Sequence, residues 1–323
     1  MHFLKSFIVM SAMAITTSPT SVHAQSAPAF PSKLVTIVVP VGPGGSYDYI
    51  GRLLGEGLGK ELGQPVVVEN RPGAGTVVGT QYVVKSAADG YTIVVGGVGS
   101  IAHAAALVKD LPFSPGKDLV PLQLVSTNSF MLSARPDFLP KNLQELITYA
   151  RANPGKLTIG TPGQGTGQAV AASMLKSLAG IDIVEVQYKG APPAYIDLMA
   201  GRIDLFFDGT GTAVPFIKSG KIRGIVSSGA ERDLAEVPTA KESGLPGLVL
   251  DSWTGLFAPA ATPRPVVLRL RQAIGKVAAS PEFRKQMASR SFEVISPPDV
   301  DTFVKAEIQR WPPLLAKAGI KPQ

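Results

Sequence analysis

Apolar residues along the chain follow two alternating patterns: short runs rich in β-branched residues, and longer stretches whose apolar positions recur at helical spacing. The run Val35 to Pro40 predicts a strand, and Tyr47 to Leu62 predicts a helix with Ile50, Leu54 and Leu58 on one face. Strands predicted at 66–69 and 91–95 and a helix predicted at 77–85 continue the series. This alternation is typical of βα units on a mostly parallel sheet, so the chain is predicted to be an α/β protein.

A second series of the same kind begins after the proline-rich stretch 111–121. Asn142 is placed to cap a helix over 143–152, which ends at Pro154 and Gly155. The remaining pattern predicts helices at 168–179, at 195–200 and shortly before Gly220, and strands at 157–160, 183–187, 203–207 and 222–227. These elements are sufficient for a second lobe with the architecture of the first.

The C-terminal part is predicted to form helices at 265–279, 281–288 and 299–311, with Pro312 and Pro313 breaking or sharply kinking the last one. No strand pattern accompanies these helices, so we expect them to pack back on the first lobe. The chain then crosses between the lobes twice, near 126–133 and near 248–253, which is typical of a hinge that closes around a ligand. The expected domains are residues 25–128 with 252–323, and residues 129–251.

Composition excludes several kinds of chemistry. The 323 residues contain no cysteine and three histidines, so thiolate metal sites and cysteine nucleophiles are excluded and no multi-histidine metal site is expected. The net charge is +7, but the basic residues are scattered, with no run longer than two. We therefore expect no nucleic-acid partner.

Residues 1–24 have the pattern of a secretory signal peptide. Lys5 precedes the apolar stretch Phe7 to Ile15, and Val22-His23-Ala24 forms a cleavage site before Gln25. The apolar stretch is shorter than the roughly 20 residues that a membrane span needs. We therefore predict an exported, periplasmic protein that is cleaved after Ala24 and retains a single histidine, His103.

Two glycine-rich loops are the strongest candidates for a binding site. One has the sequence PVGPGGSYD at 40–48 and the other TPGQGTGQ at 161–168, and each joins a predicted strand to a predicted helix. Backbone N–H groups at a helix N-terminus stabilise an anion without any lysine or arginine, although either loop alone is also compatible with a plain tight turn. Because open α/β sheets bind ligands at the carboxyl ends of their strands, the pair predicts an anion held between the lobes.

Other motifs add candidate contacts but no cofactor. The segment GVGSIA at 97–102 fits a dinucleotide fingerprint, but no acidic residue follows at the required spacing, so only Ser100 is kept as a candidate donor. Asp208 ends a predicted strand, where it either faces the cleft or caps the next helix. The sequence contains neither a G-x-x-x-x-G-K phosphate-binding loop nor a G-x-S-x-G nucleophile elbow. A lone histidine such as His103 is more often a packed side chain than a catalyst.

Further segments occur in a characteristic order: VENRPGAG at 68–75, DGYT at 89–92, YKG at 188–190, VPT at 237–239 and WTGLFAP at 253–259. Together with the first glycine loop, this set resembles the Bug family, the periplasmic solute-binding proteins of tripartite tricarboxylate transporters. The resemblance runs from about Pro31 to Lys321. It implies a two-lobed periplasmic-binding-protein (Venus flytrap) fold, a carboxylate ligand, and delivery to a membrane permease of one large and one small subunit.

The resemblance also implies which residues hold the ligand. The loops contribute Pro43, Gly44, Gly45, Ser46 and Asp48 from the first lobe and Thr161, Gly165, Thr166 and Gly167 from the second, and Asp48 is expected mainly to order its own loop. Ser100, Gln168 and Asp208 are candidates for contacting the far end of the ligand. The family pattern S-x-G-x-G-S-x-x-H is altered here at Thr161, Thr166 and Ala169, and H-V-P-Y-K-G begins with Glu185-Val186-Gln187, which leaves the identity of the carboxylate open.

The predicted function is that of a periplasmic receptor for a small di- or tricarboxylate or aromatic carboxylate. It is expected to act as a monomer, without catalytic residues, cofactor or metal, and to deliver its ligand to the transporter. Two alternatives stay open: an exported enzyme that would use His103, and a sensor that docks ligand-loaded to a signalling partner.

Overall fold

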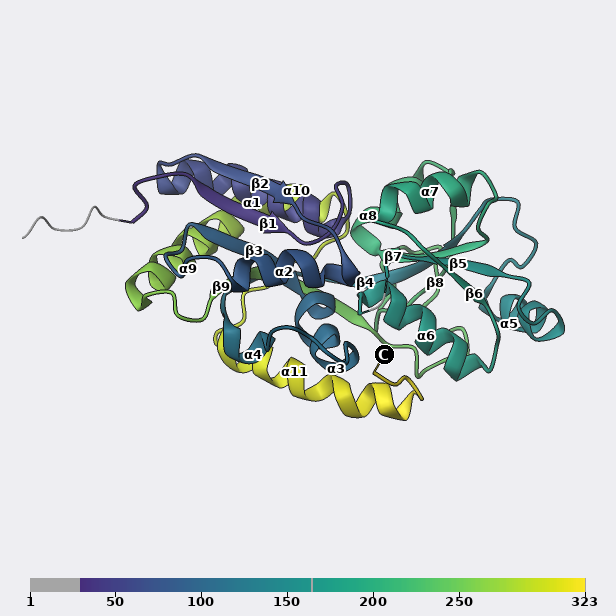
Figure 1. The fold of residues 1–323 in the computed structure, drawn as a ribbon. Helices are drawn as coiled ribbons and strands as arrows, with labels where there is room; N and C mark the ends of the chain where they lie inside the picture. Colours follow the sequence, from purple (N-terminus) through teal and green to yellow (C-terminus); the bar gives the residue numbers. More distant parts are fainter. Residues whose placement is uncertain (1–29, 164, 323) are drawn as a thin grey trace, which may run out of the picture.

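The alternating runs of the sequence fold into two α/β lobes that lie side by side in the computed structural model, which describes residues 30–163 and 165–322 (Figure 1). The predicted signal peptide lies outside the described residues. Within the described part, no helix is both long and apolar enough to cross a membrane. The two-lobed arrangement confirms the predicted fold class.

The first lobe is built on a parallel sheet of strands in the order β2-β1-β3. One face of helix α1 packs on this sheet, and Ile50, Leu54 and Leu58 are fully buried there, as their spacing predicts. The segment 97–102, which fits a dinucleotide fingerprint in sequence, forms the end of β3 and most of a short π-helix. The elements of this part of the chain are β1 (Val35–Val39), α1 (Ser46–Leu62), β2 (Val66–Asn70), η1 (Ala74–Thr76), α2 (Val77–Val84), β3 (Thr92–Gly97), η2 (Val98–His103), α3 (Ala104–Leu107) and α4 (Pro115–Asp118).

The second lobe repeats the βα alternation around strands β6, β5 and β7, of which β5 is parallel to both neighbours. Asn142 caps α5 by accepting a hydrogen bond from the Glu145 N–H at 3.0 Å, as predicted. Helix α7 begins earlier than predicted because prolines in the first helical turn are compatible with a helix start. The elements are α5 (Leu143–Ala152), β5 (Thr158–Thr161), α6 (Gly167–Ala179), β6 (Val184–Gln187), α7 (Ala191–Met199), β7 (Leu205–Gly209), α8 (Thr210–Lys218) and β8 (Arg223–Ser227).

Two antiparallel strands carry the chain between the lobes. Strand β4 (Leu119–Ala134) pairs with β9 (Asp251–Pro259) as far as Ser129 and with β7 from Phe130 onward. The sequence predicted crossings in these regions but not continuous strands, because Pro121 and the polar run 126–129 interrupt the apolar pattern. One long strand therefore belongs to both lobes.

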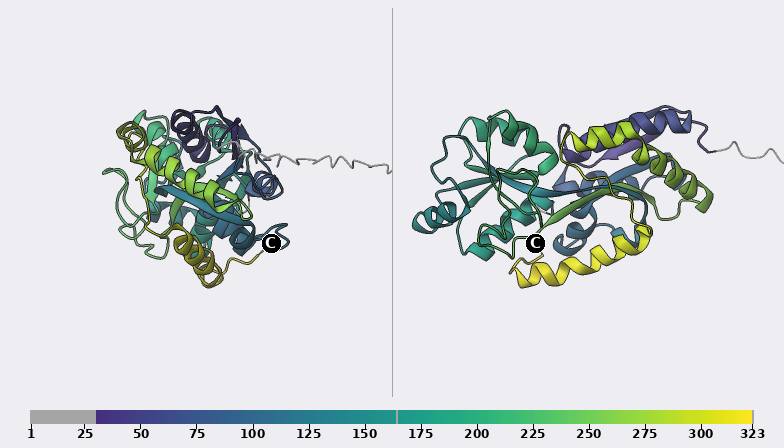
Figure 2. Two further views of the ribbon diagram at one scale, coloured as in Figure 1. Left: turned by 90° about the vertical axis from the view of Figure 1, so that its left-hand side faces the viewer. Right: turned by 180° about the vertical axis from the view of Figure 1, so that it is seen from behind.

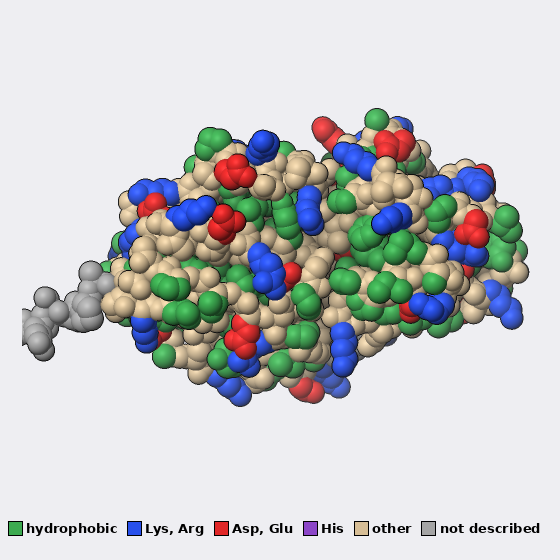
Figure 3. Space-filling view, turned by 90° about the horizontal axis from the view of Figure 1, so that it is seen from above, with side chains coloured by type: hydrophobic (Ala, Val, Ile, Leu, Met, Phe, Trp, Pro, Cys, Tyr) green, Lys and Arg blue, Asp and Glu red, His purple; other side chains and the backbone are tan. Residues whose placement is uncertain are grey.

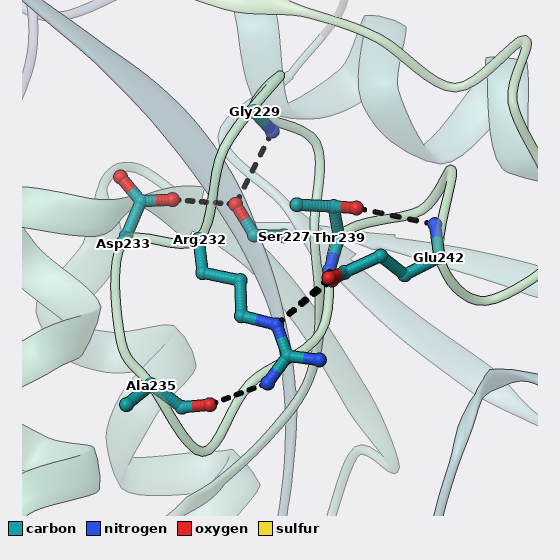
Figure 4. Close-up of polar contacts among 7 residues, drawn as sticks. All are labelled: Ser227, Gly229, Arg232, Asp233, Ala235, Thr239 and Glu242. Carbon is teal, nitrogen blue, oxygen red and sulfur yellow. Dashed lines mark hydrogen bonds and ion pairs between the residues drawn. The ribbon is translucent and has the colours of Figure 1, made fainter.

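The loop that follows β8 braces β4 at the crossing. The Asp233 carboxylate accepts hydrogen bonds from the hydroxyls of Ser129 in β4 and Ser227 in β8, each at 2.5 Å. Figure 4 shows Asp233 beside Ser227, and Arg232 bridging the Glu242 carboxylate and the carbonyl of Ala235 in the same loop. The point where β4 changes partners is thus fixed by a carboxylate from the second lobe.

The C-terminal helices are α9 (Arg264–Ala279), α10 (Pro281–Ala288) and α11 (Val300–Lys317), and α9 packs against α1. The predicted break at Pro312 and Pro313 is wrong, because α11 continues through both prolines. Both prolines are exposed, so their rings lie on the outer side of the helix. Trp311 and Leu315 on the opposite side are buried and anchor the helix on each side of the prolines.

The end of α11 reaches the second lobe. Figures 1 and 2 show the helix running along the first lobe and its C-terminal end lying beside α6. The Ser177 hydroxyl of α6 donates a hydrogen bond to the Ala318 carbonyl at 2.5 Å, and Ile320 packs against a core that includes residues of both lobes. The C-terminal segment therefore makes a third connection between the lobes, in addition to β4 and β9.

Candidate ligand-binding site

A chamber of about 60 Å³ lies between the lobes, at the carboxyl ends of the parallel strands. Its walls come from the segments that follow β1, β3, β5, β6 and β7, including Gly42, Gly99, Pro162, Gly190 and Gly209. Ligands of open α/β folds bind at this edge of the sheet. The fold therefore brings the two predicted glycine loops to one place.

Four helices of at least eight residues begin at the wall of this chamber. Their first residues or N-caps line it: Gly45 and Ser46 of α1, Thr166 and Gly167 of α6, Gly190 and Ala191 of α7, and Gly209 of α8. Each helix N-terminus carries a partial positive charge and free N–H groups. Their convergence makes the chamber favourable for an anion.

Three of these helices have a glycine N-cap. Gly45, Gly190 and Gly209 have no side chain to cap α1, α7 and α8, so their first-turn N–H groups are not occupied by a capping side chain. Among the described residues that line the chamber there is no lysine, arginine or histidine. Donors that attract an anion to this chamber therefore come from the main chain and not from cationic side chains.

The first glycine loop is ordered by Asp48. Its carboxylate accepts hydrogen bonds from the Gly44 N–H at 2.9 Å, from the Asn70 amide at 2.9 Å and from Arg52 at 3.1 Å. Burial alone would raise the pKa of Asp48, but these hydrogen bonds and the Arg52 charge outweigh burial and lower it. Asp48 thus stays ionised and holds the loop without lining the chamber.

The second glycine loop is ordered by Thr166. The Thr166 hydroxyl donates to the Gly163 carbonyl at 2.6 Å and accepts from the Ala169 N–H at 3.3 Å, so it caps α6. Its proton is engaged within the loop, whereas Thr166 and Gly167 themselves line the chamber. The Thr166 hydroxyl therefore orders the second loop, as the Asp48 carboxylate orders the first.

Asp208 is the one carboxylate among the described residues that line the chamber, and it is 1% exposed. Its oxygens accept hydrogen bonds from the Gly209 N–H at 2.8 Å, the Gln168 amide at 3.1 Å and the Tyr195 hydroxyl at 3.1 Å. Burial raises its pKa to about 6, and the three hydrogen bonds only partly oppose this shift. Asp208 therefore faces the cleft and does not cap α8.

The other predicted contacts divide into those that line the chamber and those that support it. Gly45, Ser46, Thr166, Gly167, Gln168 and Asp208 line it, whereas Pro43, Gly44, Asp48, Ser100, Thr161 and Gly165 lie outside its wall. The Ser100 hydroxyl accepts the Gly97 N–H at 3.0 Å and so holds the start of η2. Direct ligand contact by any of these residues stays a prediction.

Sequence analysis missed several lining residues: Tyr47 in the first turn of α1, Asn128 and Phe130 in β4, and Ser252 in β9. Burial raises the pKa of Tyr47 to about 12, so its phenol is neutral at physiological pH. For Tyr47, the signal in the sequence was its position directly after Ser46, which was a predicted contact. The others follow from the way β4 and β9 pass the cleft, which no local pattern encodes.

The lobes meet across the chamber through short side chains and main-chain atoms. The Ser46 hydroxyl lies 3.0 Å from the Thr212 hydroxyl of the other lobe, within hydrogen-bond distance. A Cβ atom placed on Gly42 would lie 2.5 Å from the Lys189 carbonyl oxygen, and one on Gly99 would lie 3.2 Å from the Gly167 nitrogen. Closure in this form therefore depends on glycine at the seam.

His103 is fully buried against Trp311, with ring centroids 4.2 Å apart, and neither ring nitrogen has a hydrogen-bond partner among the described residues. Burial, and to a lesser degree the charge of Arg310, lowers the pKa of His103 to about 3, so the ring is neutral. No group of three or more metal-ligating side chains is found in the described parts of the chain.

Comparison with known proteins identifies close structural neighbours. The family model described as tripartite tricarboxylate transporter family receptor matches residues 50–320. The periplasmic binding protein BugD is 33% identical, with a TM-score of 0.87 over 91% of this chain and 100% of its own. MatC from Rhodopseudomonas palustris with bound malate is 34% identical, with a TM-score of 0.85 over 88% of this chain and 100% of its own. A second R. palustris protein, with adipate, is 31% identical, with a TM-score of 0.86 over 91% and 100%.

Proposed function

This chain belongs to the tripartite tricarboxylate transporter receptor family, and we propose that it captures a small carboxylate between its two lobes. One observation carries the proposal: four helix N-termini converge on a chamber whose described lining holds no cationic side chain. A carboxylate suits such a site because its two oxygens accept several N–H donors at once.

The neighbours support the same ligand class. One was determined with malate and another with adipate, and both match more than 85% of this chain at identities above 30%. Those two ligands share carboxylate groups and differ in length. We therefore propose that the helix N-termini bind the carboxylate group and that the surrounding walls determine which ligand lengths are accepted.

The role proposed is capture without catalysis. The retained histidine, His103, is buried and neutral, and its ring nitrogens contact no nucleophilic hydroxyl among the described residues. This environment argues against the exported-enzyme alternative, because a general base must reach the proton that it removes. The closed lobes and glycine seam fit a protein that binds and releases its ligand.

Delivery to a membrane permease completes the proposal. We infer export by the predicted signal peptide, a periplasmic location and action as a monomer, with domains formed by residues 25–128 plus 252–323 and residues 129–251. The change of β4 pairing between Ser129 and Phe130 supports this boundary. Figure 3 shows basic and acidic side chains interspersed over both lobes of one face, which favours a small-molecule ligand over nucleic acid.

Thermal unfolding of residues 25–323 tests the proposal with matched pairs of carboxylates and their amides, after denaturation and refolding to remove carried-over ligand. A ligand at 100 times its dissociation constant adds about 2.7 kcal/mol, enough to raise Tm by several degrees. We expect malate or adipate to raise Tm and the corresponding diamides to leave it unchanged. Equal shifts with acid and amide, or no shift with any carboxylate, would contradict the proposal.

A glycine variant tests whether binding requires the closed seam. Gly42→Ala places a methyl group against the Lys189 carbonyl and is expected to lower carboxylate affinity by at least tenfold while each lobe still folds. Gly275→Ala, where a Cβ atom meets nothing within 4 Å, is the matched control and is expected to bind normally. Normal binding by Gly42→Ala would show that the ligand does not need this contact.

A further inference from the structure

A larger groove continues outward from the binding chamber. The groove has a volume of about 820 Å³, compared with about 60 Å³ for the chamber. The two spaces share five wall residues: Val41, Thr76, Pro162, Thr166 and Gly190. A ligand whose carboxylate lies in the chamber and whose body exceeds its volume would therefore extend into the groove.

The chemistry of the groove differs from that of the chamber. Its walls are rich in proline and valine from both lobes, namely Pro40, Val41, Pro72, Val77, Val108, Pro112 and Pro162. Its two charged residues, Asp110 and Lys189, have opposite signs and are both exposed. The groove therefore has no net charge to attract a second anion, and it offers apolar surface to whatever fills it.

We infer that this groove is the subsite for an apolar body of the ligand, so that the protein takes carboxylates carrying an alkyl chain or an aromatic ring. The inference rests on the proposed function and names its substrate class. The carboxylate is held by the main chain in the chamber, and the hydrophobic body gains affinity by leaving water between the lobes.

Val77 and Val108 are the specificity-determining residues in this arrangement. Both belong to the first lobe and are half-buried in the groove wall, and Pro162 contributes an apolar side chain from the second lobe. A ligand body in the groove would therefore lie between apolar walls of the two lobes. Apolar burial of this kind increases affinity with the length of the ligand rather than with its charge.

The test is calorimetric titration of the exported chain with straight-chain monocarboxylates from acetate to octanoate, with malate as a short reference ligand. We expect affinity to rise by up to roughly fourfold per added methylene group, with an increasingly negative heat-capacity change. The double variant Val77→Thr with Val108→Thr keeps the side-chain shapes and is expected to flatten the series. Val78→Thr on the same helix, 49% exposed and outside the groove wall, is the control and should leave the series unchanged.

Two results would overturn the inference and leave the proposed function standing. In one, acetate or malate binds but longer chains bind no more tightly. In the other, octanedioate binds more tightly than octanoate, which would place a second carboxylate in the groove near Lys189. Failure of every carboxylate, short and long, would instead overturn the proposed function together with the inference.

Discussion

Each lobe organises its side of the cleft around one buried aspartate, and the two aspartates have opposite electrostatics. Asp48 in the first lobe accepts hydrogen bonds from a guanidinium, an amide and a backbone N–H, and its pKa is lowered. Asp208 in the second lobe has no cation among its hydrogen-bond partners, and its pKa is raised to about 6. Asp48 is therefore a permanently ionised structural residue, whereas Asp208 is a residue of the chamber wall that can change its protonation state.

The difference follows from how each carboxylate is paired. Arg52 is half-exposed on α1 and supplies a charge to Asp48, whereas Asp208 is surrounded by neutral donors in the core. A buried carboxylate with neutral donors alone pays a desolvation cost that hydrogen bonds offset only in part. Hence the charge of Asp48 should not change with pH near neutrality, whereas the charge of Asp208 should.

The largest expected effect is the pH dependence of Asp208. Its pKa is about 6 in the folded protein and 3.8 without the protein environment, so the folded state binds the proton more tightly and stability falls as pH rises from 4 to 6. The fall is roughly 3 kcal/mol for a shift of this size. Denaturant unfolding at several pH values measures it.

Asp208→Asn is the matched variant for this measurement. It keeps the shape of the side chain and removes the titration, so its stability should lack the decline between pH 4 and 6. A bound anion would also favour the protonated carboxyl, so wild-type carboxylate affinity should be higher at pH 6 than at pH 8. If Asp208→Asn retained the full decline in stability between pH 4 and 6, that decline would come from another titrating group.

The next effect, in the first lobe, is loss of the Asp48 network. Asp48→Ala leaves the Gly44 N–H and the Asn70 amide without their acceptor, and we expect a stability loss of about 2 kcal/mol. Carboxylate affinity should fall at least tenfold because the loop that starts α1 loses its order. Glu56→Ala on the same helix removes an exposed pair with Lys60 and is expected to leave stability nearly unchanged.

The smallest expected effect is loss of the Thr166 cap. Thr166→Ala removes the hydroxyl that caps α6 and should cost about 1 kcal/mol of stability, whereas Thr166→Ser should restore most of it. Since the hydroxyl proton already goes to Gly163, affinity should fall only through the altered loop. A loss of ligand affinity much larger than the loss of stability would indicate direct contact with the ligand.

Much of the fold follows from local sequence patterns. The helix bounds at 143–152 and 281–288 match the prediction, because caps and prolines mark their ends. Strand β4 was not predicted, since its polar residues 126–129 lie at the crossing, where pairing with β9 decides the conformation. Helix α11 passes through Pro312 and Pro313 because buried Trp311 and Leu315 hold it, which is a tertiary effect.

The candidate site was predicted in outline. Glycine loops after strands are visible in the sequence, and Ser46, Gly167 and Asp208 lie in the chamber wall. The sequence could not place Asn128 or Ser252, whose positions depend on how β4 and β9 pass between the lobes. The sequence separated Asp48, expected to order its own loop, from Asp208, but it could not give their opposite pKa shifts, because these depend on burial in the folded chain and on tertiary partners such as Asn70 and Gln168.

The glycine N-caps have a consequence for how such a receptor diverges. Main-chain N–H groups are present whatever side chain a residue carries, so few point substitutions can delete them. A lineage can therefore replace the residues around Val77, Val108 and Gln168 and acquire a new ligand while inheriting the anion site unchanged. Duplicated copies of the gene are then free to specialise on ligand shape, starting from a shared and durable ability to hold an acid.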